Sequence, residues 1–189
     1  ALRKEEKKTA AAHLDECSTL FSEFSKVASR NPYSWFPSYR SAIEIAEETP
    51  DNRMVGFPYT KYLNSVIRVN MASAFILMSQ GKADELNVAE NKRVYVHGCS
   101  ILNDIWNVTE RPDFHSSPAI RTCVHQSLDQ AEISLSEIEH FDLYSCFPSA
   151  VQIAKKELGI PEEKKDLTVT GGLPYFGGPG NSYTMFSTT

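Results

Sequence analysis

Apolar residues recur at steps of three and four along several stretches of the chain, the spacing of helices that bury one face. The first stretch covers residues 4–29, where Leu14, Cys17 and Phe21 fall on one face. Asn31-Pro32 ends it, because the residue before a proline is disfavoured in a helix. Similar patterns predict helices at residues 41–48, 117–130 and 148–158, the last ended by Gly159.

Other stretches carry the pattern of strands. Residues 66–78 stay apolar almost throughout, which predicts a strand buried on both faces. Residues 92–99 alternate and are rich in β-branched side chains, and shorter strands are expected at 141–143 and 167–170. A short turn capped by Ser136 is expected before the strand at residues 141–143. Residues 53–65 are expected to be irregular. Strands alternating with helices predict an α/β layered domain.

Composition narrows the classes of function. The 189 residues are 41% hydrophobic and 23% charged, as in ordinary soluble proteins, and the formal net charge of −5 without a basic stripe argues against nucleic acid as a partner. The four cysteines form no CxxC or CxxH pair, so neither a zinc site nor a disulfide framework is expected. We expect reduced thiols, as in a cytosol-like compartment. No apolar stretch is long enough to span a bilayer. Neither terminus closes an element, so we expect the sequence to be a piece of a longer protein.

Two loops follow predicted strands, at Tyr144–Phe147 and at the glycine-rich segment GGLPYFGGPGNSY, residues 171–183. Ligand sites gather at the carboxyl ends of strands in α/β sheets, and glycine allows a ligand or another backbone to approach closely. The segment matches neither the phosphate-binding loop nor GxGxxG, so it gives little support to nucleotide binding. Two tight turns without a binding role are the plain alternative.

The order FDLYSCFPSAVQIAKKELGI followed by LTVTGGLPYFGGPGNSY resembles the C-terminal half of the thiolase superfamily, in the branch of sterol-carrier-protein thiolases and acetyl-CoA acetyltransferase-like proteins. The upstream stretch from Asn31 to Ser79 resembles the same branch, so the likeness covers nearly the whole chain. It implies a five-layered α-β-α-β-α fold, a mixed sheet covered by helices. Residues 1–65 would be a helical segment of the loop domain, and residues 66–189 a C-terminal domain that is incomplete at its end.

The resemblance also implies a function. Such proteins are acyltransferases of lipid metabolism that make or break a carbon–carbon bond beside an acyl-CoA thioester. Coenzyme A thioester is the substrate, and no cofactor is bound covalently. The expected partners are acyl-CoA and either a second copy of the chain or a partner subunit. The expected location is the cytoplasm, or a peroxisome or mitochondrion in a eukaryote.

Carried over by motif, Tyr144 is the candidate catalytic residue, because a phenol can donate a hydrogen bond where the family has Asn or His. The candidate substrate-binding residues are Ser145, Cys146, Gly171, Gly172, Gly177, Gly178, Asn181 and His97. No metal ligand is expected. We expect Tyr144 to face the glycine-rich segment while Leu143 faces the core. Gly172 or Gly177 should adopt a positive φ or touch another backbone.

The motifs also depart from the family. The second loop of thiolases reads Gly-His-Pro, whereas Gly178 stands here in place of the histidine, and Met185-Phe186 stands where this branch is expected to have one. The nucleophilic cysteine and a last cysteine loop would lie outside the chain. A non-catalytic acyl-CoA-binding or partner subunit, or a retro-aldol lyase subunit, therefore stays open beside the acyltransferase. His97 also fits a structural histidine, and Cys146 a small buried apolar residue.

Overall fold

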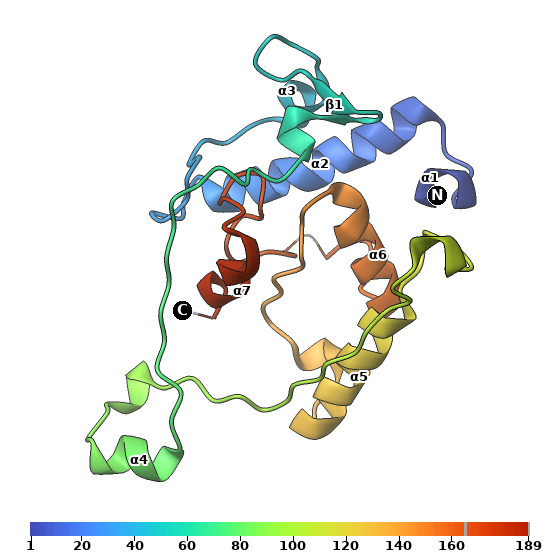
Figure 1. Cartoon of the computed structure of the whole chain (residues 1–189). Coiled ribbons are helices and arrows are strands. Elements are labelled where there is room, and N and C mark those ends of the chain that lie inside the picture. Colours follow the sequence, from blue (N-terminus) through green and yellow to red (C-terminus); the bar gives the residue numbers. More distant parts are fainter. Residues whose placement is uncertain (165, 189) are drawn as a thin grey trace.

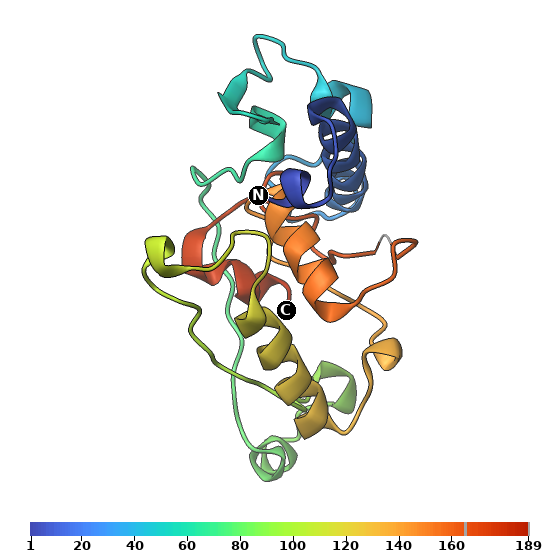
Figure 2. The same cartoon turned by 90° about the vertical axis from the view of Figure 1, so that its right-hand side faces the viewer.

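The computed structural model describes residues 1–164 and 166–188. Its helices and strands follow one another along the chain as Figure 1 labels them. They are α1 (Leu2–Glu5), α2 (Ala10–Ala28), α3 (Ala42–Ala46), β1 (Met54–Gly56), β2 (Tyr59–Thr60), α4 (Gln80–Glu85), α5 (Pro118–Ala131), α6 (Pro148–Leu158) and α7 (Tyr183–Phe186). Helix α2 is the longest element, with α3 and β1 on one side of it and α6 on the other (Figures 1 and 2).

The predicted helix over residues 4–29 is divided into α1 and α2. Lys7 adopts a left-handed φ of 53°, and the hydroxyl of Thr9 accepts a hydrogen bond from the amide of Ala12 at 3.2 Å, which caps α2. The charged residues before Thr9 carry no apolar face, so periodicity gave no sign of this break.

The helices predicted at residues 41–48, 117–130 and 148–158 are confirmed as α3, α5 and α6. Ser41 and Glu44 form a capping box at the start of α3, and Gly159 ends α6 with a left-handed φ of 64°. The short turn Leu135–Glu137 is capped by Ser134, so the expected cap at Ser136 is wrong. Helices α4 and α7 and the β1–β2 hairpin were not predicted.

The predicted strands at residues 66–78, 92–99, 141–143 and 167–170 are not paired as strands in the described part of the chain, and Lys92 belongs instead to the short turn Glu90–Lys92. One backbone hydrogen bond, from Leu143 N to Leu167 O at 3.0 Å, links the last two of them. The ladder that the described residues do form is β1 against β2, antiparallel. Residues 66–78 are not buried on both faces, since Ile76 is 83% exposed. An apolar pattern indicates a tendency to bury, but a strand also needs a hydrogen-bonded neighbour.

The main core joins the helical start of the chain to its end. It consists of the buried side chains of Cys17, Phe21, Phe24, Ala28, Ile45, Leu63, Val151, Ile160, Leu167 and Tyr175. The rings of Phe21 and Phe24 stack with centroids 5.3 Å apart, and Tyr175 meets Phe21 edge-on. This core fixes the glycine-rich segment against α2 and α6. Among the described residues, no helix combines the length and apolarity needed to cross a bilayer.

Candidate functional site

Glycines of the glycine-rich segment adopt the positive φ angles that the sequence predicts. Gly171, Gly172 and Gly177 have φ values of 109°, 77° and 122°, which L side chains rarely adopt. This confirms the expectation for Gly172 and Gly177. Gly178 has no positive φ, but a side chain there would come within 3.1 Å of the carbonyl oxygen of Val66.

The glycines serve close packing within the chain. A Cβ on Gly171 would lie 2.6 Å from the Cα of Ala28 at the end of α2. One on Gly172 would lie 2.8 Å from the hydroxyl of Ser145, and one on Gly177 would meet the sulfur of Met71 at the same distance. All four glycines are buried. Protein atoms therefore occupy the space beside these glycines where a side chain would lie. The glycines can contribute to binding only through the shape that they give the loop.

Ser145 is the residue that joins the two predicted loops. Its side chain is fully buried, and its hydroxyl accepts a hydrogen bond from the amide of Leu173 at 3.0 Å. Beside it, the carboxylate of Asp142 accepts from the hydroxyl of Thr168 at 2.7 Å and from the amide of Val169 at 3.3 Å. Because these bonds run from residues 142–145 to residues 168–173, they hold the two loops against each other.

Threonine hydroxyls continue this network into the glycine-rich segment. Thr168 accepts from the amide of Gly171 at 2.9 Å, and Thr170 accepts from the amide of Gly172 at 3.2 Å. The phenol of Tyr183 in α7 pairs with the Thr170 hydroxyl at 2.7 Å, and burial raises the pKa of Tyr183. The amides of Gly171 and Gly172 are thus already bonded to threonine hydroxyls and are not open donors for a ligand.

Tyr144 lies next to this network but points elsewhere. Its side chain is 58% exposed and lies near the thiol of Cys146, while Leu143 packs against the main core as predicted. Burial and the Cys146 contact raise the pKa of Tyr144, so the phenol keeps its proton at neutral pH. The side chain that reaches the glycine-rich segment from here is Ser145, which the alternation of a short strand did not single out.

The thiols near these loops are not activated. Burial raises the pKa of Cys17 to about 12 and also raises the pKa of Cys146. Cys17 and His13 are four residues apart on α2, and their side chains meet at 3.7 Å. Burial lowers the pKa of His13, so the imidazole stays neutral beside a protonated thiol. This buried pair does not form the ion pair that a nucleophilic thiolate needs.

The remaining candidates lie apart from the loops. His97 is exposed and has no hydrogen bond or ion pair with a described residue. The next residue, Gly98, packs against the carbonyl of Ser127 in α5. Asn181 is exposed in the short turn Gly180–Ser182. The structure therefore brings Ser145, Gly171 and Gly172 together and leaves His97 and Asn181 outside their contacts.

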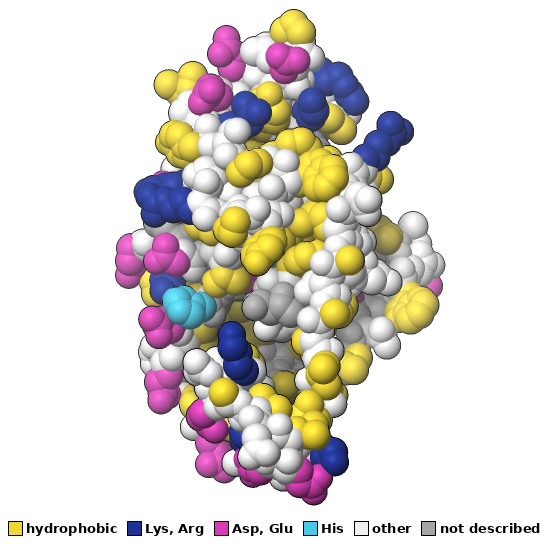
Figure 3. Space-filling model, turned by 90° about the vertical axis from the view of Figure 1, so that its left-hand side faces the viewer, with side chains coloured by type: hydrophobic (Ala, Val, Ile, Leu, Met, Phe, Trp, Pro, Cys, Tyr) yellow, Lys and Arg dark blue, Asp and Glu magenta, His cyan; other side chains and the backbone are white. Residues whose placement is uncertain are grey.

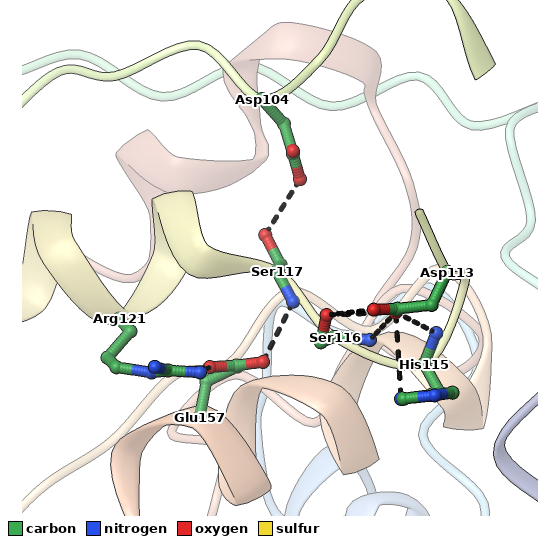
Figure 4. Close-up of polar contacts among 7 residues, drawn as sticks. All are labelled: Asp104, Asp113, His115, Ser116, Ser117, Arg121 and Glu157. Carbon is green, nitrogen blue, oxygen red and sulfur yellow. Dashed lines mark hydrogen bonds and ion pairs between the residues drawn. The ribbon is translucent and has the colours of Figure 1, made fainter. Parts of the chain in front are cut away.

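A second polar cluster, shown in Figure 4, was missed by the sequence. The Glu157 side chain on α6 is 2% exposed, and its carboxylate accepts from Arg121 on α5 at 2.5 and 2.8 Å and from the amide of Ser117 at 2.8 Å. Ser117 in turn donates to Asp104 at 3.0 Å. These bonds fasten α5 to α6 and satisfy a buried charge, which is a structural role. Within the described residues, no group of three or more His, Cys, Asp or Glu is placed to hold a metal.

Comparison with known proteins supports the fold. No family model matches the sequence, and no curated protein does. Among solved structures, the chain is similar to a monomeric SCP2-thiolase like protein type 1 from Mycobacterium smegmatis, with 35% sequence identity and a TM-score of 0.86. The match covers 98% of this chain and 41% of that protein, so the chain spans about two-fifths of its length. The chain therefore has an α/β fold of the SCP2-thiolase-like kind, which confirms the predicted fold class.

Proposed function

We propose that this chain forms the part of a thiolase-like acyltransferase that faces the acyl thioester, in a protein that makes or breaks a carbon–carbon bond beside an acyl-CoA. The observation that carries the proposal is the network of Asp142, Ser145, Thr168 and Thr170, which fixes the Tyr144–Phe147 loop against the glycine-rich segment. A site that stabilises developing charge needs such rigid support. The similarity to an SCP2-thiolase-like protein supports the class of reaction.

In this proposal Tyr144 donates a hydrogen bond to the thioester oxygen. It is the exposed polar side chain of its loop, and its raised pKa keeps the proton on the phenol. Helix α6 begins directly after this loop, at Pro148, so its first amides add positive potential where negative charge would develop. Donors of the oxyanion-hole type stabilise a transition state by about 2–4 kcal/mol.

The acyl-accepting thiolate would come from residues outside this chain. Thioester exchange needs a thiolate and a base that activates it. Cys17 and Cys146 both have raised pKa values, and Gly178 stands where the family motif has histidine. Coenzyme A takes part as the substrate, and no covalently bound cofactor is required. The similar M. smegmatis protein is described as monomeric, which favours one copy over a homodimer in solution.

Two assays test the proposal. The purified 189-residue chain alone should show no acetoacetyl-CoA thiolysis above a heat-denatured control. In a protein that carries this chain together with the rest of the fold, Tyr144→Phe should lower turnover about 30- to 1,000-fold with little change in stability. Tyr33→Phe is the matched control, because Tyr33 is a 77% exposed tyrosine outside the loops. Turnover by the isolated chain, or full activity of Tyr144→Phe, would contradict the proposal.

A second candidate is a protein that binds acyl-CoA without turnover. The pairing of a protonated Cys17 with a neutral His13 and the glycine at position 178 favour it, since both leave this chain without an activated nucleophile. Calorimetric titration of the longer protein with acetyl-CoA separates the two candidates. Binding without loss of the thioester supports the second, and consumption of the thioester supports the first.

A further inference from the structure

Exposed hydrophobic side chains are common on this chain, as the face drawn in Figure 3 shows, so such side chains alone single out no site. A buried polar group is more informative, because native proteins keep such groups only where they have hydrogen-bond partners. The phenol of Tyr183 in α7 is a group of this kind. Tyr183 is 3% exposed, and it has no part in the proposed hydrogen bond to the thioester.

The hydroxyl of Tyr183 meets side chains that belong to both loops or directly precede them. It pairs with the hydroxyl of Thr170 at 2.7 Å and donates to the carboxylate of Asp142 at 3.5 Å. The side chain of Ser145 also interacts with it. Burial raises the pKa of Tyr183, so the phenol keeps its proton and remains a donor. Tyr183 thus joins α7 to the glycine-rich segment and to the Tyr144–Phe147 loop.

These contacts fall on both sides of Tyr144 in the chain. Asp142 precedes Tyr144 by two residues, and Ser145 follows it directly. Since both neighbours are tied to Tyr183, its hydroxyl limits how far the backbone of the loop can shift. It therefore helps to set where the exposed phenol of Tyr144 lies. Position matters in catalysis, because a displacement of about 1 Å can lower a rate about a hundredfold.

The ring and the hydroxyl of Tyr183 have separate partners. The ring packs edge-on against Phe176 with centroids 6.3 Å apart, in a buried cluster that also contains Leu173. Phenylalanine at position 183 would keep this packing and remove the hydroxyl alone. Tyr183→Phe should therefore leave α7 in place while releasing the ties to Asp142 and Thr170.

We propose that Tyr183 is a positioning residue for the reaction, which holds the Tyr144 loop where the Tyr144 phenol can donate to the thioester oxygen. The hydroxyl of Tyr183 is buried among protein side chains, so it acts through Tyr144 and does not touch the substrate. Because this role is exerted in turnover, it rests on the proposed function.

Steady-state kinetics test this role in a protein that carries the chain together with the rest of the fold. Tyr183→Phe should lower kcat about tenfold or more and leave KM for the acyl-CoA within about twofold, because the hydrogen bond from Tyr144 strengthens in the transition state. In the double variant with Tyr144→Phe, kcat should fall no further than in Tyr144→Phe alone, since both substitutions act through one phenol.

Tyr175→Phe is the matched control. Tyr175 is a buried tyrosine whose hydroxyl donates to the carbonyl of Tyr62 at 3.0 Å. Each substitution removes one buried phenol hydroxyl and keeps the ring, but Tyr175 has no hydrogen bond to the residues beside Tyr144. Tyr175→Phe should therefore change kcat by less than about twofold.

Hydrogen exchange of the isolated 189-residue chain tests the same tie without turnover. The amide of Leu143, which lies between Asp142 and Tyr144 in the chain, is bonded to the carbonyl of Leu167 at 3.0 Å. It should exchange about fivefold faster or more in Tyr183→Phe than in Tyr175→Phe. Circular dichroism checks that both variants keep their helices. If Tyr183→Phe does not fold, Ser145→Ala removes a contact of the same phenol from the other loop and takes its place in each comparison.

The outcomes separate this role from the proposed function. If Tyr144→Phe lowers turnover but Tyr183→Phe matches Tyr175→Phe in kcat or in the exchange of Leu143, the positioning role is overturned and the proposed function stands. Independent losses that multiply in the double variant also overturn it, because Tyr183 would then not act through Tyr144. Full turnover by Tyr144→Phe, or no turnover by the longer protein, overturns the proposed function and this role with it.

Discussion

The glycine-rich segment and the segment at residues 67–78 differ in what surrounds them, although both have sequences typical of a protein interior. Residues 171–178 are buried against α2 and the Ser145 loop. In residues 67–78, Ile76 and Leu77 are exposed by more than four-fifths. The first segment is buried throughout by partners within the chain, whereas in the second Met71 packs against Leu173 and Phe176 but Ile76 and Leu77 stay exposed. An apolar sequence therefore indicates a tendency to be buried, and whether it is buried depends on which partners the chain contains.

The largest loss of folding stability is expected for Gly171→Ala. The new Cβ would overlap the backbone of Ala28, and φ at this position is 109°. Backbone strain and overpacking together should lower the free energy of unfolding by about 3 kcal/mol or more. Urea denaturation measures this.

Gly81→Ala is the control for that substitution. Gly81 lies in α4 with open space around it, so alanine should stabilise the chain by about 0.5–1 kcal/mol through helix propensity alone. Equal effects of the two substitutions would mean that the glycine-rich segment is not closely packed against α2.

A smaller loss is expected for Asp142→Ala. The substitution leaves the hydroxyls of Thr168 and Thr170 and the amide of Val169 without their acceptor, which should cost about 1–3 kcal/mol of stability. Asp129→Ala on the exposed face of α5 is the control and should change stability by less than about 0.5 kcal/mol. If the two variants unfold at the same urea concentration, the network does not hold the loops.

The packed region should also respond to acid. Burial lowers the pKa of His13 below its ordinary value of 6.5, so the folded chain binds fewer protons there than the unfolded chain. Stability should therefore fall as the pH drops below 6.5. Urea midpoints measured from pH 7.5 to 5.5 check this, and the decline should be smaller in His13→Gln. His97→Gln should keep the wild-type decline, because His97 is exposed. A decline of the same size in His13→Gln would assign the acid sensitivity to other groups.

The smallest effect is expected in the open segment. Phe75→Ala should change the stability of the isolated chain by less than about 0.5 kcal/mol, because this ring is 56% exposed. Phe24→Ala, which removes a fully buried ring of the main core, should cost about 3–5 kcal/mol. Thermal unfolding of the two variants compares the regions directly, and similar losses would show that residues 67–78 are already packed in the isolated chain.

The helices and the glycine conformations could be predicted because their causes are local. Periodicity and caps located α5 and α6, and the glycine-rich sequence predicted the positive φ of Gly172 and Gly177. The missing strand pairs could not be predicted, since an apolar run does not show whether its neighbour lies in the same chain. The Glu157–Arg121 pair was missed for a related reason, because its residues lie far apart in the sequence.

The candidate site was predicted in part. The two loops do meet, but the contact is made by Ser145, and Tyr144 is exposed beside Cys146. Alternation along a strand predicts which side chains share a face, but it does not predict how the chain turns where the extended segment ends. The His13–Cys17 contact follows from spacing on α2, and its inactive protonation state follows from burial, which the sequence does not give.

Hydrogen exchange of the isolated 189-residue chain tests most directly whether the glycine-rich segment is packed while the apolar extended segments are open to solvent. Mass spectrometry of proteolytic peptides compares residues 167–178 with residues 67–78 and 94–106. The structure predicts slow exchange in the first peptide, where the amides of Gly171, Gly172 and Leu173 are bonded to buried hydroxyls, and rapid exchange in the other two. Equal protection of all three, or rapid exchange in residues 167–178, would contradict it.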